Sequence, residues 1–130
     1  MFMQTEQFIT DVAQRGHTED RELAANISHA TVEVLCMYLP AQQTFDLASQ
    51  LPKELAKSAE AGAQQAEADA RDISLEAFFE QVAVRCHRPA GEIEAGARAA
   101  AATFQNALSR NESIDVALDA PASLEALLTG

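Results

Sequence analysis

Apolar side chains recur at intervals of three and four along most of this chain, which is the period of an amphipathic helix. A first helix is predicted over residues 4–15, with Phe8 and Val12 on one face and Gly16 at its end. A second helix then extends to about Leu39. Its expected apolar face is a single stripe made of Leu23, Ile27, Ala30, Val34 and Tyr38. The pattern therefore predicts an all-α fold.

Capping and breaking residues indicate where these helices begin and end. Thr18 is the predicted N-cap of the second helix, because its hydroxyl can accept a hydrogen bond from a free backbone N–H. Pro40 ends that helix and opens a short third one, which Pro52 ends in turn. Asp46 and its later counterpart Asp115 are each expected near the start of a short helix, where a negative charge stabilises the N-terminus.

Residues 56–70 differ from the rest, because they hold seven alanines and no large apolar residue. Alanine favours helix, but a helix with little to bury is weakly held by packing. We expect residues 56–73 to form a helical or frayed connector.

After Ser74, an expected N-cap, the pattern of the first half begins again. The halves match at an offset of 70 residues through the first helix, and at an offset of 69 in the third. Matched pairs include Glu6 and Glu76, Phe8 and Phe78, Val12 and Val82, Arg15 and Arg85, His17 and His87, Phe45 and Ile114, Asp46 and Asp115, and Pro52 and Pro121. A register kept over three helices predicts two tandem copies of one unit.

We therefore predict a single domain over residues 1–130. It consists of repeat one at 4–55, the Ala-rich connector at 56–73 and repeat two at 74–128, with three to four helices in each repeat. One repeat cannot cover its own apolar face, so the two are expected to pack about a pseudo-twofold axis as an orthogonal helical bundle. Leucine, isoleucine, valine and the six phenylalanines are the expected core anchors.

The segments that carry the repeat also resemble a known family. The run EQFITDVAQR, the long second helix and the run FDLASQLP are similar to uncharacterised bacterial proteins grouped as domain of unknown function 2267. Members of that family look like two helical repeats, each closing on a Leu-Pro step. Here the first half has Leu51-Pro52, whereas the second departs from the step with Ala120-Pro121. The resemblance implies a fold and no catalytic residue.

The charge balance excludes several classes of partner. The formal net charge is −11, and acids exceed bases in every part of the chain. Such a surface repels phosphate, so we expect neither nucleic-acid binding nor binding to an anionic membrane. The sequence has no signal-peptide pattern and no apolar stretch of transmembrane length. Two cysteines make no disulfide framework, so a reducing cytoplasm is the expected compartment.

Two matched helix ends are the motifs most able to carry chemistry. If the pseudo-twofold axis brings them together, His17, His87 and Cys86 can form a metal site or a small polar pocket, with Cys36 or an acid as a fourth zinc ligand. The alternative is that these basic ends only offset the helix dipole and cap free carbonyls. The two motifs are Arg15-Gly16-His17 and Arg85-Cys86-His87.

The cysteines and His29 have simpler interpretations. Cationic neighbours lower the pKa of a thiol, which would make Cys86 reactive. Free cysteine is nevertheless among the most buried residue types, so burial is the favoured interpretation for Cys86 and Cys36. His29 is expected at the boundary between the core and the solvent.

A strip of small residues marks the long helix of the second half. It includes Gly96, Ala97, Ala100 and Ala101. One hypothesis is that the bulky face around Ile27 in the first half packs into this strip. The other is that the strip is a seam between two copies of the chain.

No phosphate-binding loop, nucleophile elbow or dinucleotide fingerprint is present, and we expect no cofactor. We therefore predict a non-enzymatic protein-interaction or scaffold module, which binds another protein or itself. The alternative is a small-ligand or metal-binding domain that uses the two Arg-His ends.

Overall fold

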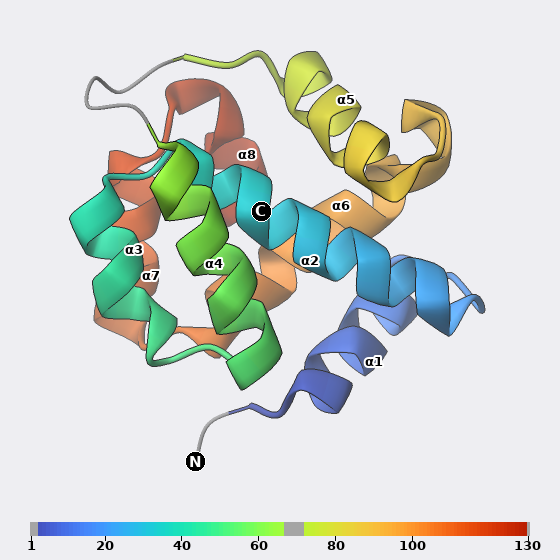
Figure 1. Ribbon diagram of the computed structural model, residues 1–130, viewed down its shortest axis with the longest axis horizontal. Helices are drawn as coiled ribbons and strands as arrows, with labels where there is room; N and C mark the ends of the chain where they lie inside the picture. Colours follow the sequence, from blue (N-terminus) through green and yellow to red (C-terminus); the bar gives the residue numbers. More distant parts are fainter. Residues whose placement is uncertain (1–2, 67–71, 130) are drawn as a thin grey trace.

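A computed structural model describes residues 3–66 and 72–129, and within these ranges every regular element is a helix (Figure 1). The elements are α1 (Thr5–Arg15), α2 (Arg21–Met37), α3 (Ala41–Ala48), α4 (Lys53–Gln65), α5 (Leu75–Cys86), α6 (Ala90–Ala107), α7 (Arg110–Asp119), η1 (Ala122–Leu124) and α8 (Glu125–Thr129). The all-α helical bundle is confirmed, while the repeat symmetry stays a prediction. None of the described helices has the length and apolarity needed to cross a bilayer.

Most helix ends follow the capping residues of the sequence. Gly16 closes α1, and the Ser74 side chain accepts a hydrogen bond from the Ala77 N–H at the start of α5. The N-cap of α2 is Asp20 and not Thr18, so that prediction was wrong. The Asp20 Oδ1 accepts from the Leu23 N–H at 3.0 Å, because Asp is at least as good a cap as Thr and stands two residues closer to the helix.

Helix α2 is the centre of the bundle, and α1, α4, α5 and α6 all pack against it (Figure 1). Its buried surface is wider than the single stripe expected from the sequence. Val32, Leu35 and Cys36 are buried in addition to Ile27 and Val34. A helix covered from several sides loses its polar face, so periodicity alone underestimated its burial.

Helix α4 is packed much more firmly than the expected connector. It makes the most extensive helix–helix contact of the described chain, against α2. Leu55, Ala59, Gly62 and Ala63 are buried there. The expectation that packing would not hold residues 56–65 was wrong, since their small side chains allow a close approach. Residues 67–71, also part of the expected connector, lie outside the described residues.

The small strip of α6 faces the inside of the same chain. Gly96, Ala97, Ala100 and Ala101 are all buried. A Cβ added at Gly96 would lie 2.7 Å from Ile27 Cδ1, so α6 rests directly on α2. The hypothesis that the strip is a seam between two copies is therefore wrong, because α1 and α2 of the same chain already pack against α6.

The two matched aspartates also need a correction. Asp46 lies in the second half of α3 and Asp115 in the middle of α7, so neither is at a helix N-terminus. Pro40 and Ser109 are the N-cap residues of these helices instead. Both aspartates are exposed, so their charges lie at the surface of the protein.

Candidate functional site

The two histidines of the matched helix ends share an unusual backbone conformation. His17 has φ 54° and His87 has φ 55°, which is the left-handed region. Each follows the last turn of its helix and closes it with a pair of hydrogen bonds typical of a Schellman motif. These bonds are His17 N to Gln14 O, Thr18 N to Ala13 O, His87 N to Val84 O and Arg88 N to Ala83 O. The common geometry gives both histidines a backbone role at a helix end.

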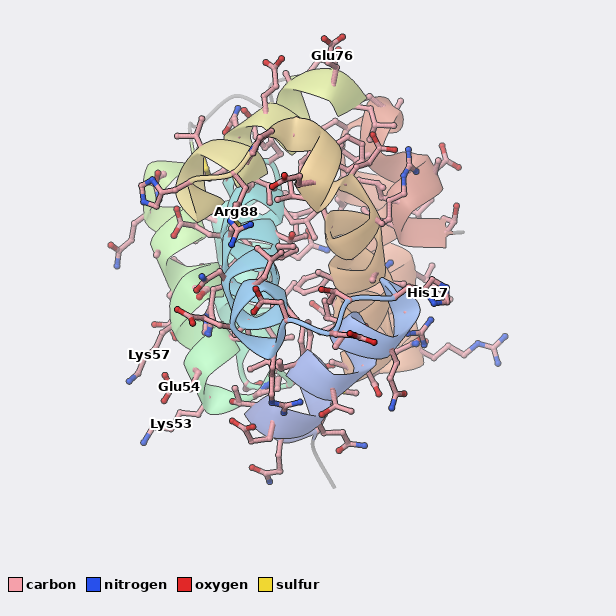
Figure 2. All side chains as sticks on the ribbon, turned by 90° about the vertical axis from the view of Figure 1, so that its right-hand side faces the viewer. His17, Lys53, Glu54, Lys57, Glu76 and Arg88 are labelled. Carbon is pink, nitrogen blue, oxygen red and sulfur yellow. The ribbon has the colours of Figure 1, made fainter. Side chains whose placement is uncertain are left out.

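The histidines do not meet in one site. His17 and His87 are both exposed, and Figure 2 shows His17 well apart from Arg88, the chain neighbour of His87. Within residues 3–66 and 72–129, no three or more His, Cys, Asp or Glu side chains are grouped so that they could hold a metal ion. The proposed metal-site trio of His17, His87 and Cys86 is therefore not assembled.

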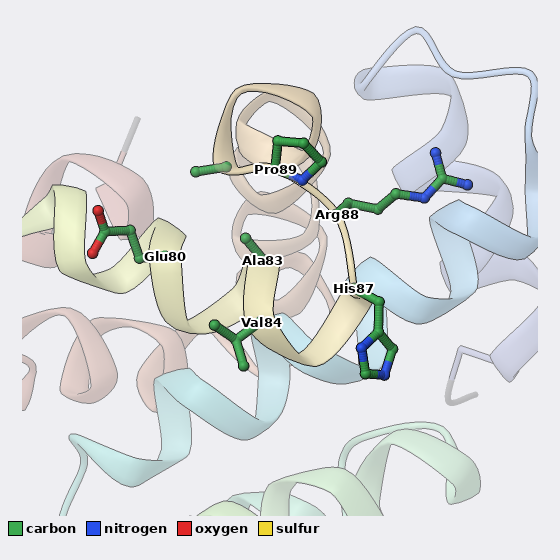
Figure 3. A pocket seen from close by; sticks show the side chains of 7 residues that line it. Glu80, Ala83, Val84, His87, Arg88 and Pro89 are labelled. Carbon is green, nitrogen blue, oxygen red and sulfur yellow. The ribbon is translucent and has the colours of Figure 1, made fainter.

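One of the two ends borders an open depression of about 590 Å³ between α5 and α6. Ala83, Val84, Pro89 and Ala90 supply its apolar lining, and Glu80, His87 and Arg88 supply its charged and polar groups. Figure 3 shows the Glu80, His87 and Arg88 side chains pointing in different directions. The depression is thus an apolar surface with separate polar groups around it, and it does not concentrate them on one point.

Arg85 holds a polar network that sequence analysis missed. Its Nε donates to Glu33 Oε2 at 2.7 Å, and both side chains are 26% exposed. Gln65 donates to the same carboxylate oxygen at 3.2 Å, so the network joins α5, α2 and α4. Arg15, the matched residue of the first half, is exposed. Each arginine stands two residues before a matched histidine, so the sequence gave no signal that Arg85 would bind a carboxylate of α2.

Both cysteines are free and buried, which confirms the favoured interpretation. Burial raises the pKa of the Cys86 thiol, and the nearby Arg88 guanidinium lowers it by a smaller amount. Burial raises the pKa of Cys36 to about 12, and the nearby Thr44 hydroxyl opposes that shift by a smaller amount. Neither thiol has the low pKa that a nucleophile needs. His29 is half-buried beside Ser58, as expected for a boundary position.

A second surface is formed by α3 and α7, which lie on the same side of the bundle in Figure 1. The backbone N–H of Ser109, the N-cap of α7, donates to Gln50 Oε1 just beyond α3 at 2.6 Å. Phe45 on α3 is 47% exposed, and on α7 Ile114 is 48% and Leu118 76% exposed. Phe45 was expected in the core, so its exposure corrects that expectation.

Acidic side chains accompany these apolar ones. The pKa of Glu112 on α7 is raised, first by partial burial and then by the charges of Asp115 and Asp46. Because Asp46 belongs to α3, its charge acts on Glu112 across the two helices. We use the name α3–α7 face for the exposed apolar residues and the acids of these two helices, which are Phe45, Asp46, Glu112, Ile114, Asp115 and Leu118.

The described residues define an all-helical protein with no assembled group of metal ligands. The chain belongs to the family described as uncharacterized conserved protein (DUF2267), whose model matches residues 5–127. This confirms the resemblance drawn from the sequence, and the family has no assigned function. A comparison with curated proteins finds no match.

Proposed function

We propose that this chain is a non-enzymatic protein-interaction module of the cytoplasm and that it binds its partner through the α3–α7 face. The observation that carries the proposal is the exposure of Phe45 on α3 and of Ile114 and Leu118 on α7, two helices whose ends are joined by the hydrogen bond from Ser109 to Gln50. Large apolar side chains gathered on a surface are typical of protein interaction sites. Val84 on α5 is the other large apolar side chain that the described residues leave exposed.

The free energy available from burying Phe45, Ile114 and Leu118 indicates how much else the partner must contact. Covering one large apolar side chain completely contributes about 1.5–3 kcal/mol, and these three are already partly covered. Association costs roughly 4–15 kcal/mol of lost motion. The three side chains are therefore the apolar centre of an interface, and polar contacts around them must supply the remainder.

Further observations support a role without catalysis. His17 and His87 are exposed, and the described residues do not bring them together with Cys86 in one site. Cys36 and Cys86 are buried, and the pKa of each is raised. Two unpaired cysteines also fit a reducing compartment.

Photo-crosslinking in the native cells tests this proposal. A photoreactive amino acid replaces Leu118 in one strain, Phe45 in a second and Val84 in a third. We expect positions 118 and 45 to capture the same protein, identified by mass spectrometry, and position 84 to capture none. The proposal is wrong if positions 45 and 118 capture nothing, or if position 84 captures the same protein equally well.

The depression between α5 and α6 favours a second candidate function, the binding of a small ligand. Its apolar lining lies beside the charged side chains of Glu80 and Arg88. A thermal-shift screen of metabolite classes, with elemental analysis of the purified protein, tests it. A ligand that raises the melting temperature of the wild-type chain but not of Arg88→Ala would support this candidate. A ligand that stabilises both equally, or a screen without any stabilising ligand, would exclude it.

A further inference from the structure

We propose that the partner of the α3–α7 face is a basic amphipathic helix of another protein. This inference rests on the proposed function, because it names the chemistry of the partner at the same surface. It rests on two properties of the face, its excess of acids and the spacing of its apolar side chains, and on the net charge of the whole chain.

The first property is the local charge. Helices α3 and α7 carry the acids Asp46, Glu112, Asp115 and Asp119, against Arg110 as their one basic residue. Among the described residues, none of these acids forms an ion pair, and Asp46 accepts a hydrogen bond from Gln42 instead. Like charges held close together repel one another, so Lys or Arg side chains from a partner would relieve that repulsion.

The second property is the apolar spacing. Ile114 and Leu118 are four residues apart, so they form a stripe along one face of α7. Phe45 is the exposed apolar side chain of α3, the helix whose end is joined to the start of α7 by the hydrogen bond from Ser109 to Gln50. An amphipathic helix presents apolar side chains at the same three- and four-residue intervals and places charged residues beside them. Leucine-type residues of the partner would cover the stripe, while its flanking lysines would reach the acids.

The third property argues against a second copy of this chain as the occupant. The chain has a formal net charge of −11. A twofold contact through this face would place each acid near the acids of the other copy, because such an interface uses the same patch twice. Repulsion across the contact would oppose assembly, whereas a basic segment is attracted by the same charges.

Peptide titration of the full chain, followed by nuclear magnetic resonance, tests the inference. The probe is a synthetic helical peptide of leucine and lysine, with its leucines in one stripe. Two control peptides are used. One has the same composition in scrambled order, and the other has glutamate in place of each lysine. We expect the probe to shift resonances of α3 and α7 in a saturable one-to-one complex, and the controls to bind at least tenfold more weakly.

Matched variants separate this surface from general attraction to an acidic protein. Phe45→Ser with Leu118→Ser should weaken binding of the probe at least tenfold, while Val84→Ser should leave it unchanged. Asp46→Asn with Asp115→Asn should weaken it several-fold and reduce its salt dependence. All these side chains are exposed, so the variants are expected to fold, as circular dichroism checks.

Several outcomes would overturn the inference. They are equal binding of the scrambled peptide, unchanged binding by the Phe45→Ser, Leu118→Ser variant, or shifts spread over the whole acidic surface. A dimer in sedimentation velocity that the same double variant abolishes would assign the face to a second copy. If crosslinking at Leu118 captures a partner whose contacting segment lacks basic residues, this inference fails while the proposed function stands.

Discussion

Gly62 lies where α4 packs against α2, and replacing it with alanine tests the most extensive helix contact of the described residues. A Cβ at this position would collide with the backbone carbonyl oxygen of Glu33 and would lie 3.0 Å from the Cβ of Cys36. Neither group is the mobile end of a side chain, so relief requires the two helices to separate. In an isolated helix the same change would be favourable, because alanine is a better helix former than glycine by about 0.5–1 kcal/mol.

The two effects differ enough to decide the sign. Overpacking a well-filled interior costs about 1–3 kcal/mol and occasionally more, and here the obstacle is backbone. We therefore expect Gly62→Ala to lose about 1–2 kcal/mol of unfolding free energy after the gain in helix propensity. That loss corresponds to a melting temperature lower by roughly 4 °C for each kcal/mol in a chain of this length.

Two glycines of another helix, α6, provide matched controls. A Cβ at Gly96 would lie 2.7 Å from Ile27 Cδ1, the far end of that side chain, and 3.3 Å from its Cγ2, whereas a Cβ at Gly91 would meet nothing within 4 Å. Gly96→Ala is expected to lose less stability than Gly62→Ala, because the obstacle is a side chain and not backbone, and Gly91→Ala to gain up to about 1 kcal/mol.

Urea unfolding followed by helical circular dichroism measures all three variants, with an unchanged m-value as the check that the same transition is compared. The reasoning is refuted if Gly62→Ala is as stable as the wild-type chain. It is also refuted if the order of the three variants is reversed.

Three further predictions concern the helix ends and the surface charges. His17→Gly and His87→Gly should each stabilise the chain by about 0.5–1 kcal/mol in thermal unfolding, because glycine adopts the left-handed region without strain, and alanine at the same positions should give no gain. Arg85→Ala should destabilise by about 1–3 kcal/mol, since it leaves the half-buried Glu33 carboxylate with the Gln65 amide but without its charged partner, whereas Arg15→Ala should stay within about 0.5 kcal/mol. The raised pKa of Glu112 means that the folded chain favours its protonated form, so this group contributes stability at acidic pH that is lost as the pH rises through its folded pKa. Glu112→Gln should therefore raise the melting temperature at neutral pH and not at pH 3, and an equal change at both pH values would contradict the assignment.

The sequence predicted the helices well, because their signals are local. The period of apolar residues, the glycine after α1 and the N-cap Ser74 each act within a turn or two of where they stand. Phe8 and Phe78, matched in the proposed repeat, are both fully buried. Such features depend on the chain nearby, so they are visible without a tertiary structure.

Contacts between distant segments left no local signal in the sequence. Helix α4 was underestimated because a close glycine contact leaves no apolar signature, and Gly62 meets Glu33 only in the folded chain. Phe45 was placed in the core because phenylalanine is usually buried. The Arg85–Glu33 pair was not predicted, because it joins two residues far apart in the sequence.

These contacts also change where function is best sought. The sequence suggested that function lies where the two halves differ, at the small strip of α6 and the connector. The structure uses the small strip for internal packing, since Gly96 lies against Ile27. The surface left for a partner instead combines matched positions of the two halves, Phe45 with Ile114, and each is followed by an aspartate. In each half the apolar residue and the acid that follows it are both exposed. They contribute little to folding stability, because an apolar side chain stabilises the fold only when it is buried. Their shared exposure on α3 and α7 is therefore the feature of this chain that folding explains least and that binding a basic amphipathic partner explains best.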